Sequence, residues 1–411
     1  MNWIDKRQQT REKRKTQTCK VFELKLDSSH LSKRKSNYLK KLFLEAKWLY
    51  NDILSTKDVF KYDTKPNIVE VLNKDKVKEK REMFFLSSQM KQAVKQKIEY
   101  AIKSLSSKKK KSKNKQRIGR LKFTSNYKSL VMNQYNMTYR FLQKGKYVKF
   151  QKCKYKFKIS GYQQIPGNAE FVNATLTYRH NDYYLKVTTY VPKEELLCEG
   201  VIGIDFGLKD ALTLSTGEKF KLKIPENKRL RKCSRRLKKR VKRSSNYFKM
   251  KNMMNKEYHK LTNKKKDKKN KIVSKIINKY KVVICQDESI KAWHHGNYGK
   301  SVQHSLLGGI MRDLERKSHT FIKVDRFFPS TQLCPECGNK KKLTLKERIY
   351  NCSCGYQEDR DTKSALCIML EGLKQIPAGC RESTPEEIVP LLGNYVRITE
   401  QVRSLSQEAI A

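Results

Sequence analysis

The chain has 411 residues, of which 37% are hydrophobic, so it can build two or three domains with their own cores. Its 93 Lys and Arg against 40 Asp and Glu give a formal net charge of +53, a degree of self-repulsion that excludes a compact protein without a polyanionic partner. Nucleic acid is the leading partner. A solvated basic surface and an anionic membrane are the alternatives.

Cysteine use and the absence of long apolar runs indicate a cytoplasmic protein. Seven of the 11 cysteines are scattered singly, and an odd, dispersed set suits a reducing compartment better than a disulfide framework. The first residues, MNWIDKRQQTREKRKTQ, lack the apolar core of a signal peptide. No run of about 18 apolar residues predicts a membrane span.

The first half of the chain predicts a β-barrel interrupted by helices. Alternation over residues 18–27 predicts a half-buried strand, and helical apolar stripes cover 36–54 and 87–105. Alternation returns from 121 to 192, with a turn signal at 180–182. Strands before and after a helical pair therefore favour a small barrel with a helical insertion.

Two basic segments are candidate contacts for a phosphate backbone. Residues 106–122 are either a solvated linker or such a contact. Residues 228–271 hold 21 Lys and Arg against two acids, along a sparse apolar stripe of helical period. This pattern predicts a long basic helical hairpin, which would repel itself unless it lay along a polyanion.

The second half predicts an α/β domain. VIGIDFG at 201–207 is a buried strand that ends in an acid and a Gly turn, and strand 281–286 runs into two further acids. An amphipathic helix is expected over 302–317 and a strand over 319–328. The segment from 376 has no sustained stripe, and we expect it to be poorly ordered.

Four cysteines have the spacing of a structural zinc site. Two residues separate Cys334 from Cys337, fourteen residues follow, and one residue separates Cys352 from Cys354. Four thiolates close a tetrahedral Zn²⁺ site without an open position, so the metal would be structural and not catalytic. The alternative is four unrelated reduced thiols. The second pair is tighter than usual but feasible.

Three acids at the ends of hydrophobic elements are candidate catalytic ligands for Mg²⁺. They are Asp205, Glu288 and Asp361. A lone Asp at a strand end is more often a turn former or a helix cap. Three such carboxylates in a very basic chain can instead gather divalent ions and approach a phosphate. Two ions about 3.5–4 Å apart support phosphodiester hydrolysis, and oxygen ligands favour Mg²⁺.

In combination these motifs resemble TnpB, the family of RNA-guided DNA endonucleases that insertion sequences encode and that is related to type V CRISPR effectors. The resemblance rests on GIDFG at 203–207, PSTQLCPECG at 329–338 and CSCGYQEDRD at 352–361. Upstream segments such as LFLEAKWLYNDIL at 42–54 extend it, so that it covers about 18–370.

The resemblance implies an α+β multidomain fold. It implies a wedge-like β-barrel in 1–30 and 121–199, with a helical recognition insertion in 31–120. It implies an RNase H-like split RuvC domain in 200–330, which includes the basic hairpin 228–271, and in 358–375. A zinc ribbon would occupy 331–357, and 376–411 would be a disordered tail.

The resemblance also implies which residues act. The first RuvC aspartate matches Asp205 and the third matches Asp361. The family commonly has Glu where this chain has Gln286, so Glu288 is interpreted as the relocated second acid. Residues 286 and 288 would face the same side if the strand continued, and Asp287 would point away.

Four neighbouring residues are placed outside the catalytic set. Asp359 is expected to support the catalytic acids or to be structural, without binding the metal itself. Lys363 stands where the family often has Asn. His294 and His295 are interpreted as surface loop residues.

The implied function is Mg²⁺-dependent hydrolysis of DNA by a RuvC site that a guide RNA directs to its target DNA. No membrane and no small organic cofactor are expected, and the oligomeric state stays open. Gln286 leaves open a nuclease-inactive, RNA-guided DNA-binding repressor. The third alternative is a transposase that joins DNA strands without a guide.

Overall fold

The computed structural model describes residues 3–73, 77–111, 119–193, 198–222, 224, 227–295, 299, 302, 305–344 and 347–375. Contacts within the chain divide it into two units, Met1–Glu194 and Glu195–Ala411. Residues 112–118 of the predicted basic linker and the predicted disordered tail at 376–411 lie outside the described residues.

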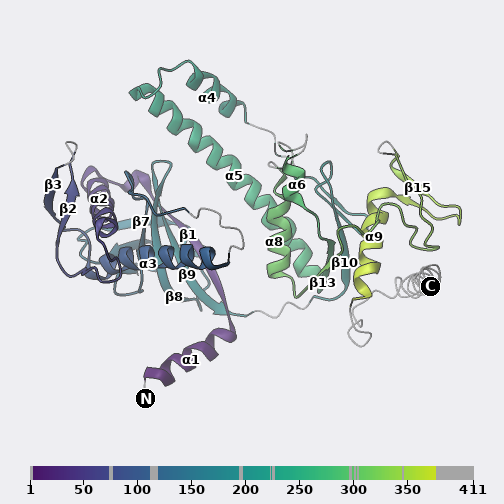
Figure 1. Ribbon diagram of the computed structural model, residues 1–411, viewed down its shortest axis with the longest axis horizontal. Coiled ribbons are helices and arrows are strands. Elements are labelled where there is room, and N and C mark those ends of the chain that lie inside the picture. Colours follow the sequence, from purple (N-terminus) through teal and green to yellow (C-terminus); the bar gives the residue numbers. More distant parts are fainter. Residues whose placement is uncertain are drawn as a thin grey trace. The chain divides into compact units, whose positions relative to one another are not determined.

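The N-terminal unit is built on a seven-stranded antiparallel sheet in the order β4-β8-β9-β1-β7-β6-β5 (Figure 1). Its longest pairing joins β1 to β9, from Gln17 opposite Pro192 to Lys25 opposite Tyr184. The strands are β1 (Gln17–Leu26), β4 (Ser129–Met132), β5 (Tyr139–Leu142), β6 (Tyr147–Phe150), β7 (Lys156–Ser160), β8 (Glu170–Arg179) and β9 (Asp182–Pro192).

The connection between β4 and β5 brings the two ends of this sheet together. The Tyr135 backbone N–H donates to the Val172 carbonyl of β8 at 3.0 Å. The rings of Tyr135 and Phe141 pack on Phe171, with centroids 4.7 and 5.2 Å away. The sheet is therefore barrel-like and nearly closed, as the alternating pattern predicts.

Two helices and a hairpin lie between β1 and β4. Helices α2 (Lys33–Ser55) and α3 (Ser88–Lys111) contain the two predicted helical stripes. Between them β2 (Ile68–Leu72) and β3 (Lys78–Glu82) pair as an antiparallel hairpin that the helical prediction missed. Helix α1 (Trp3–Lys15), which precedes β1, was not predicted either.

The C-terminal unit is built on a mixed five-stranded sheet in the order β12-β11-β10-β13-β14. The first three strands form an antiparallel meander, while β13 and β14 run parallel to β10. These strands are β10 (Val201–Phe206), β11 (Leu212–Leu214), β12 (Lys219–Phe220), β13 (Val282–Gln286) and β14 (Thr320–Val324).

Helices cover both faces of this sheet. On one face, α5 (Ser245–Lys279) and α8 (Leu307–Lys317) bury an apolar cluster against β10, β11 and β13. On the other, α9 (Arg360–Leu373) packs against β10, β13 and β14. The short helix α6 (Ile290–His295) follows β13. Helix α8 begins at Leu307, since Leu306 before it has a left-handed φ of 57°.

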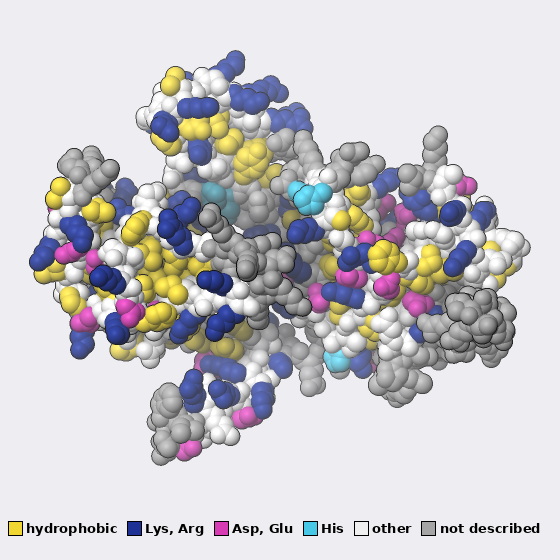
Figure 2. All heavy atoms as spheres, viewed as in Figure 1, with side chains coloured by type: hydrophobic (Ala, Val, Ile, Leu, Met, Phe, Trp, Pro, Cys, Tyr) yellow, Lys and Arg dark blue, Asp and Glu magenta, His cyan; other side chains and the backbone are white. Residues whose placement is uncertain are grey.

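The predicted basic hairpin consists of α4 (Lys228–Lys238) and the N-terminal part of α5, which pack against each other. Figure 1 shows the pair projecting beyond the sheet, and Figure 2 shows Lys and Arg side chains gathered on this projection. Helix α5 continues past the predicted end, because its last turns carry apolar residues that pack on the sheet.

The segment between β14 and α9 holds the four-cysteine module. Its strands β15 (Ile349–Asn351) and β16 (Gln357–Asp359) pair antiparallel and lead directly into α9. The module is thus inserted between the last strand of the sheet and the helix that begins with Arg360 and Asp361.

Candidate functional site

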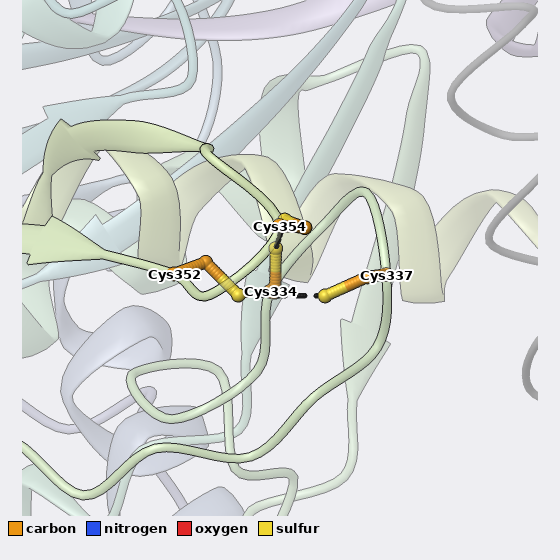
Figure 3. A group of neighbouring side chains, drawn as sticks. All are labelled: Cys334, Cys337, Cys352 and Cys354. Carbon is orange, nitrogen blue, oxygen red and sulfur yellow. Dashed lines mark hydrogen bonds between the residues drawn. The ribbon is translucent and has the colours of Figure 1, made fainter.

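The four predicted cysteines form one cluster (Figure 3). The Sγ atoms of Cys334, Cys337, Cys352 and Cys354 all lie within 4.8 Å of one another. Sγ of Cys334 is 3.7 Å from Sγ of Cys354, and Sγ of Cys337 is 3.4 Å from Sγ of Cys352. A tetrahedral zinc about 2.3 Å from each sulfur separates the sulfurs by about 3.8 Å. The donor set therefore fits zinc, and the prediction that these cysteines gather is confirmed.

After each cysteine pair the chain turns at a glycine whose backbone lies in the left-handed region. Gly338 follows the first pair with a φ of 70°, and Gly355 follows the second with a φ of 96°. The Gly338 N–H donates to the Cys334 carbonyl at 3.1 Å, and the Gly355 N–H donates to the Cys352 carbonyl at 3.2 Å. The tight second pair is therefore sterically accommodated.

The second pair also favours a thiolate. Burial on its own raises the pKa of Cys352, but hydrogen bonds from the Cys354 backbone and from neighbouring thiols outweigh it and lower this pKa to about 6. Since zinc binds the thiolate and not the thiol, this environment prepares one ligand for a metal.

A buried lysine ties the cysteine module to α9. Lys363 is fully buried, and its Nζ donates to the carbonyl oxygens of Ser330 at 2.9 Å and Leu333 at 3.0 Å. Its Nζ also lies 4.2 Å from the ring centroid of Tyr350 in β15. Burial lowers the pKa of Lys363. This side chain fixes the entry of the module, just before Cys334, to the helix that carries Asp361.

The predicted acids meet at one edge of the C-terminal sheet. Asp205 is the penultimate residue of β10, and Glu288 lies two residues beyond the end of β13. Because β10 and β13 are adjacent and parallel, their carboxyl ends share this edge, where open α/β sheets bind ligands. Asp361 reaches it from the first turn of α9.

A missing side chain lets α9 lie directly on β10. A Cβ atom on Gly203 would stand 2.1 Å from the Ala365 carbonyl oxygen and 2.7 Å from Cβ of Met369. Only glycine fits so close an approach between strand and helix. The close packing brings the start of α9, with Asp361, to the strand that carries Asp205.

The electrostatics of Asp205 show that the three acids interact. Burial, together with the charges of Asp361 and Glu288, raises the pKa of Asp205 to about 7, against the opposing effects of Arg360 and Lys363. Burial also raises the pKa of Glu288. A buried carboxyl group on which two further acids act is suited to a divalent cation.

The three acids are more widely spaced than the cysteines. Among the residues that the structure describes, the cysteines are the set of ligating side chains whose ligand atoms lie within 4.8 Å of one another. The acids influence the pKa of Asp205 without forming so tight a group. Asp361 is held by two arginines, with Arg360 Nε 3.4 Å from Oδ1 and an Arg348 nitrogen 3.9 Å from Oδ2.

Gln286 does not take the place of a catalytic glutamate. It is buried, and its Nε2 donates to the backbone carbonyls of Asp325 at 3.1 Å, Arg326 at 3.0 Å and Phe328 at 2.7 Å. The Ser330 hydroxyl donates to its Oε1 at 3.2 Å. The side chain therefore organises the loop after β14, a task for which an amide donor is required.

Glu288 is placed by a turn and not by strand alternation. Strand β13 ends at Gln286, so the premise of a continuing strand is not met. The Glu288 N–H donates to the Gln286 carbonyl, and the Ile290 N–H donates to the Glu288 carbonyl, both at 2.9 Å. Asp287 pairs with Arg326, whose guanidinium nitrogens lie 2.9 Å from its carbonyl and carboxylate oxygens.

Asp359 supports the site as a helix cap. Its Oδ1 accepts the backbone N–H groups of Asp361 and Thr362, both at 3.1 Å, and the Lys219 ammonium at 2.8 Å. Burial works against the charged form, but these contacts lower the pKa of Asp359 overall. The carboxylate thus orients the first turn of α9.

The structure adds residues whose role sequence reasoning missed. The three carbonyl acceptors of Gln286, the Arg326 pair with Asp287 and the two carbonyl acceptors of Lys363 all join segments more than 25 residues apart. In the sequence, the only sign of these roles was that positions 286 and 363 differ from the residues that the resemblance leads one to expect there. His294 and His295 are exposed, as expected, but they lie in the last turn of helix α6 and not in a loop.

Comparison with known proteins matches two parts of the chain to family models. Residues 183–289 match the family described as "Probable transposase", OrfB_IS605. Residues 310–368 match the family described as "Cas12f1-like, TNB domain". These segments contain β10 with Asp205, β13 with Glu288, and the cysteine module with Asp361.

A curated relative from Streptomyces pristinaespiralis, named as an RNA-guided DNA endonuclease, is 25% identical over 203 residues. The match takes in 45% of this chain and 50% of that protein, so it spans about half of the relative's length.

Two solved structures are similar at low identity. One is a Cas12f1–sgRNA–target DNA complex, at 13% identity and a TM-score of 0.28, over 86% of this chain and 99% of that one. The other is a CRISPR-Cas12f ternary complex, at 17% identity and a TM-score of 0.27, over 82% of each chain. At these scores neither carries an argument about geometry. No helix among the described residues is long and apolar enough to cross a membrane.

Proposed function

From the premise that the chain is of the TnpB type, which both family models and the curated relative support, we propose that it is an RNA-guided DNA endonuclease. A guide RNA would select the target by base pairing, and the protein would grip the backbones and hydrolyse DNA phosphodiester bonds. The mixed five-stranded sheet with its inserted cysteine module supports an RNase H-like RuvC unit.

The observation that carries this proposal is the placement of Asp205 and Glu288 at the carboxyl ends of the adjacent parallel strands β10 and β13, with Asp361 in the first turn of α9, which packs on β10. Burial comes first in raising the pKa of Asp205 to about 7, and the charges of Asp361 and Glu288 add to the effect. Such a perturbed acid cluster is typical of a functional site. Asp205, Glu288 and Asp361 would hold Mg²⁺, which when bound supplies charge for an attacking water and a leaving oxygen.

The cysteine module would hold a structural zinc. All four coordination positions are thiolates, so no open position remains for substrate. Its contribution would be to position α9, because it lies between β14 and that helix and Lys363 joins it to the helix core.

The proposal is tested by cleavage of DNA that matches the RNA copurified with the full-length protein. We expect cutting in Mg²⁺ that EDTA abolishes and that Asp205→Ala reduces by at least about 1,000-fold. A mismatched DNA of equal length is the control for guidance. If the parent protein leaves matched DNA intact under these conditions, it is not this nuclease.

A second function, an RNA-guided DNA-binding repressor, is favoured by Gln286 at a position where the family usually has glutamate. The two functions separate on one variant. If Glu288 is a catalytic ligand, Glu288→Gln loses cleavage and keeps target binding in a gel-shift assay. If the site is inactive, parent and variant bind alike and neither cuts.

A further inference from the structure

The loop after β14, which Arg326 joins to Asp287 in the turn before Glu288, presents an aromatic side chain. Phe327 is 86% exposed, more than any other large hydrophobic side chain among the described residues. The adjacent Phe328 is partly buried in the core under α9. Single exposed hydrophobic residues are common, so exposure alone does not identify a site.

The backbone around Phe327 is fixed from several directions. The Phe327 N–H donates to Oδ1 of Asp325 at 2.8 Å, and the Phe328 N–H donates to the Asp325 carbonyl at 3.2 Å. The Gln286 amide binds the carbonyls of Asp325, Arg326 and Phe328. An exposed ring on a backbone held in this way loses little conformational entropy when it binds a ligand.

The fixed loop is also joined to the segment that carries Glu288. Arg326, the residue before Phe327, binds both the carbonyl and the carboxylate of Asp287. Its charge acts on Glu288 as well, where it opposes the effect of burial on the pKa. Phe327 is therefore one residue from a guanidinium that contacts the turn between β13 and Glu288.

A fixed exposed aromatic ring suits a nucleobase when the residue before it, Arg326, binds the turn that leads to Glu288 at the edge of the proposed nuclease site. Bases stack on aromatic side chains without sequence preference, and basic side chains hold the backbone beside them. In a duplex both faces of a base are already covered by its neighbours. The ligand that can cover the Phe327 ring is therefore a base of an unpaired strand.

We propose that Phe327 is a stacking platform for an unpaired nucleobase of the DNA strand that enters the acid cluster. The inference rests on the proposed nuclease function and adds the form of its substrate at the cut. The strand would be single at that point, with one base on Phe327 and a neighbouring phosphate directed towards Asp205, Glu288 and Asp361. Phe327 is on this view a substrate-binding residue, and Gln286 is the residue that positions it.

The test measures stacking and cutting separately. Binding is followed with full-length protein and its copurified RNA in an Asp205→Ala background, on single-stranded DNA that carries 2-aminopurine at successive positions. Stacking quenches this base. We expect quenching at one or two positions with Phe327 and with Phe327→Trp, and loss of quenching with Phe327→Leu and Phe327→Ala.

In the active background the Leu and Ala variants should raise KM for a DNA with an unpaired target strand by on the order of 10- to 100-fold. Their kcat should change much less, since stacking contributes to binding before and during the reaction. Ile349→Ala, which removes another exposed apolar side chain, at 54% exposure on β15, is the matched control and should leave quenching and KM unchanged.

Each result separates this inference from the nuclease proposal. If Phe327→Leu quenches and binds as the parent does, the ring does not stack and the inference is overturned, whether or not the protein cuts. If quenching depends on the ring while matched DNA stays uncut, the stacking site stands and the nuclease function fails. Equal zinc content and equal Tm among the variants exclude misfolding as the cause.

Discussion

At position 286 one amide group satisfies acceptors that a carboxylate cannot. Gln286 Nε2 has three backbone carbonyl oxygens within 3.1 Å, and its Oε1 accepts the Ser330 hydroxyl. Glutamate, the residue more common in the family, would place a buried negative charge against three carbonyl oxygens. At 286 the amide side chain therefore holds a loop, which agrees with the proposal that Glu288 supplies the acid.

Changing Gln286 to glutamate, the residue more common in the family, should therefore lower both stability and cleavage. We expect it to lower the free energy of unfolding by about 2–4 kcal/mol and to reduce cleavage, because a buried group loses its donors and gains a charge. Urea denaturation and a cleavage assay measure the two effects. Glu288→Gln, which leaves the Gln286 contacts in place, is the control for stability. Higher cleavage by Gln286→Glu would mean that 286 is still the position of the catalytic acid.

Burial of the Asp205 carboxylate lowers the free energy of unfolding of the metal-free protein, by an amount that depends on pH. The folded pKa of about 7 lies above the ordinary value of 3.8, because burial comes first among the causes and the other two acids add to it. A raised carboxyl pKa means that stability falls as pH rises from about 4 and that the loss is complete above about 7. Asp205→Asn removes this cost.

We therefore expect Asp205→Asn to stabilise the metal-free protein by up to about 4 kcal/mol at pH 8 and by less than half of that at pH 5. Chemical denaturation in EDTA at both pH values measures it. Asp267→Asn, at an exposed position on α5, is the control and should show no such dependence. An equal gain at pH 5 and pH 8 would contradict the raised pKa.

At the residue scale, a local pattern marked the candidate acids but not the residues around them. Asp205 lies at the end of the apolar strand β10 and Glu288 two residues beyond β13, and that pattern is visible along the chain. The partners of Gln286 and Lys363 are backbone carbonyls 30 or more residues away, so no local pattern announces them. Phe327 was missed for a similar reason, because only the folded loop shows which of two adjacent phenylalanines is buried.

Among the elements, α9 depends on the cysteine module that precedes it. The module enters through Leu333, whose carbonyl accepts Lys363 Nζ, and leaves through β16, which runs into the Asp359 cap of α9. Both ends of the module are thus attached to the first two turns of the helix that carries Asp361. If the module holds zinc as proposed, loss of the zinc should displace Asp361.

Replacing Cys334 tests this dependence. Cys334→Ser should lose zinc, since three thiolates bind the ion far less tightly than four, and cleavage should fall by at least about tenfold because Asp361 is displaced. Metal analysis and a cleavage assay give the two values. Cys19→Ser, at an exposed cysteine in β1, should change neither. Full cleavage by a zinc-free Cys334→Ser protein would separate the module from the active site.

Helices and strands whose apolar residues recur with a clear period were predicted. A strand whose conformation depends on its pairing with a neighbouring strand was not. The stripes at 36–54 and 87–105 became α2 and α3, and the alternation at 18–27 became β1. Strand β3 has the sequence KEKRE, which has no apolar residue and low strand propensity, so its pairing with β2 sets its conformation. Glu45 of α2 then holds the exit of that hairpin by accepting the backbone N–H groups of Phe84, Phe85 and Leu86.

On the scale of the whole molecule, the net charge of +53 favours a polyanionic partner, and part of this charge is concentrated on the α4–α5 hairpin. Lys232, Arg235 and Lys239 are exposed there. Side chains of this kind bind phosphates by releasing counterions, so their contribution appears as a dependence of affinity on salt.

Changing Lys232, Arg235 and Lys239 together to Ala should weaken nucleic-acid binding without changing the preference for matched DNA. The slope of log K against log salt should become shallower by up to about 2.7, or about 0.9 per lost phosphate contact. Filter binding between 50 and 300 mM salt measures the slope. The control changes Lys232 and Lys239 to Arg and Arg235 to Lys, so that the charge of the hairpin is kept. An unchanged slope would show that the hairpin does not meet the backbone.

Composition and element order were enough to predict an α+β chain with a barrel-like sheet before an α/β unit. The barrel was predicted, but the contacts of the Tyr135 and Phe141 rings with Phe171 join segments that alternation alone does not pair. The close packing of α9 on β10 at Gly203 could not be predicted from the sequence either. It depends on atoms of α9, about 160 residues further along the chain, with which a Cβ atom at position 203 would clash.

The order of the parts along the chain has a consequence for synthesis on the ribosome. The unit Met1–Glu194 is synthesised before Asp205, whereas Asp361 follows only after the sheet, the hairpin and the cysteine module. At translation rates of about 5–20 residues per second, this interval is roughly 10–30 s. A nascent chain can therefore fold its first unit while the acid cluster is still incomplete. If the chain binds a guide RNA and cuts DNA as proposed, assembly with RNA comes before the capacity to cut.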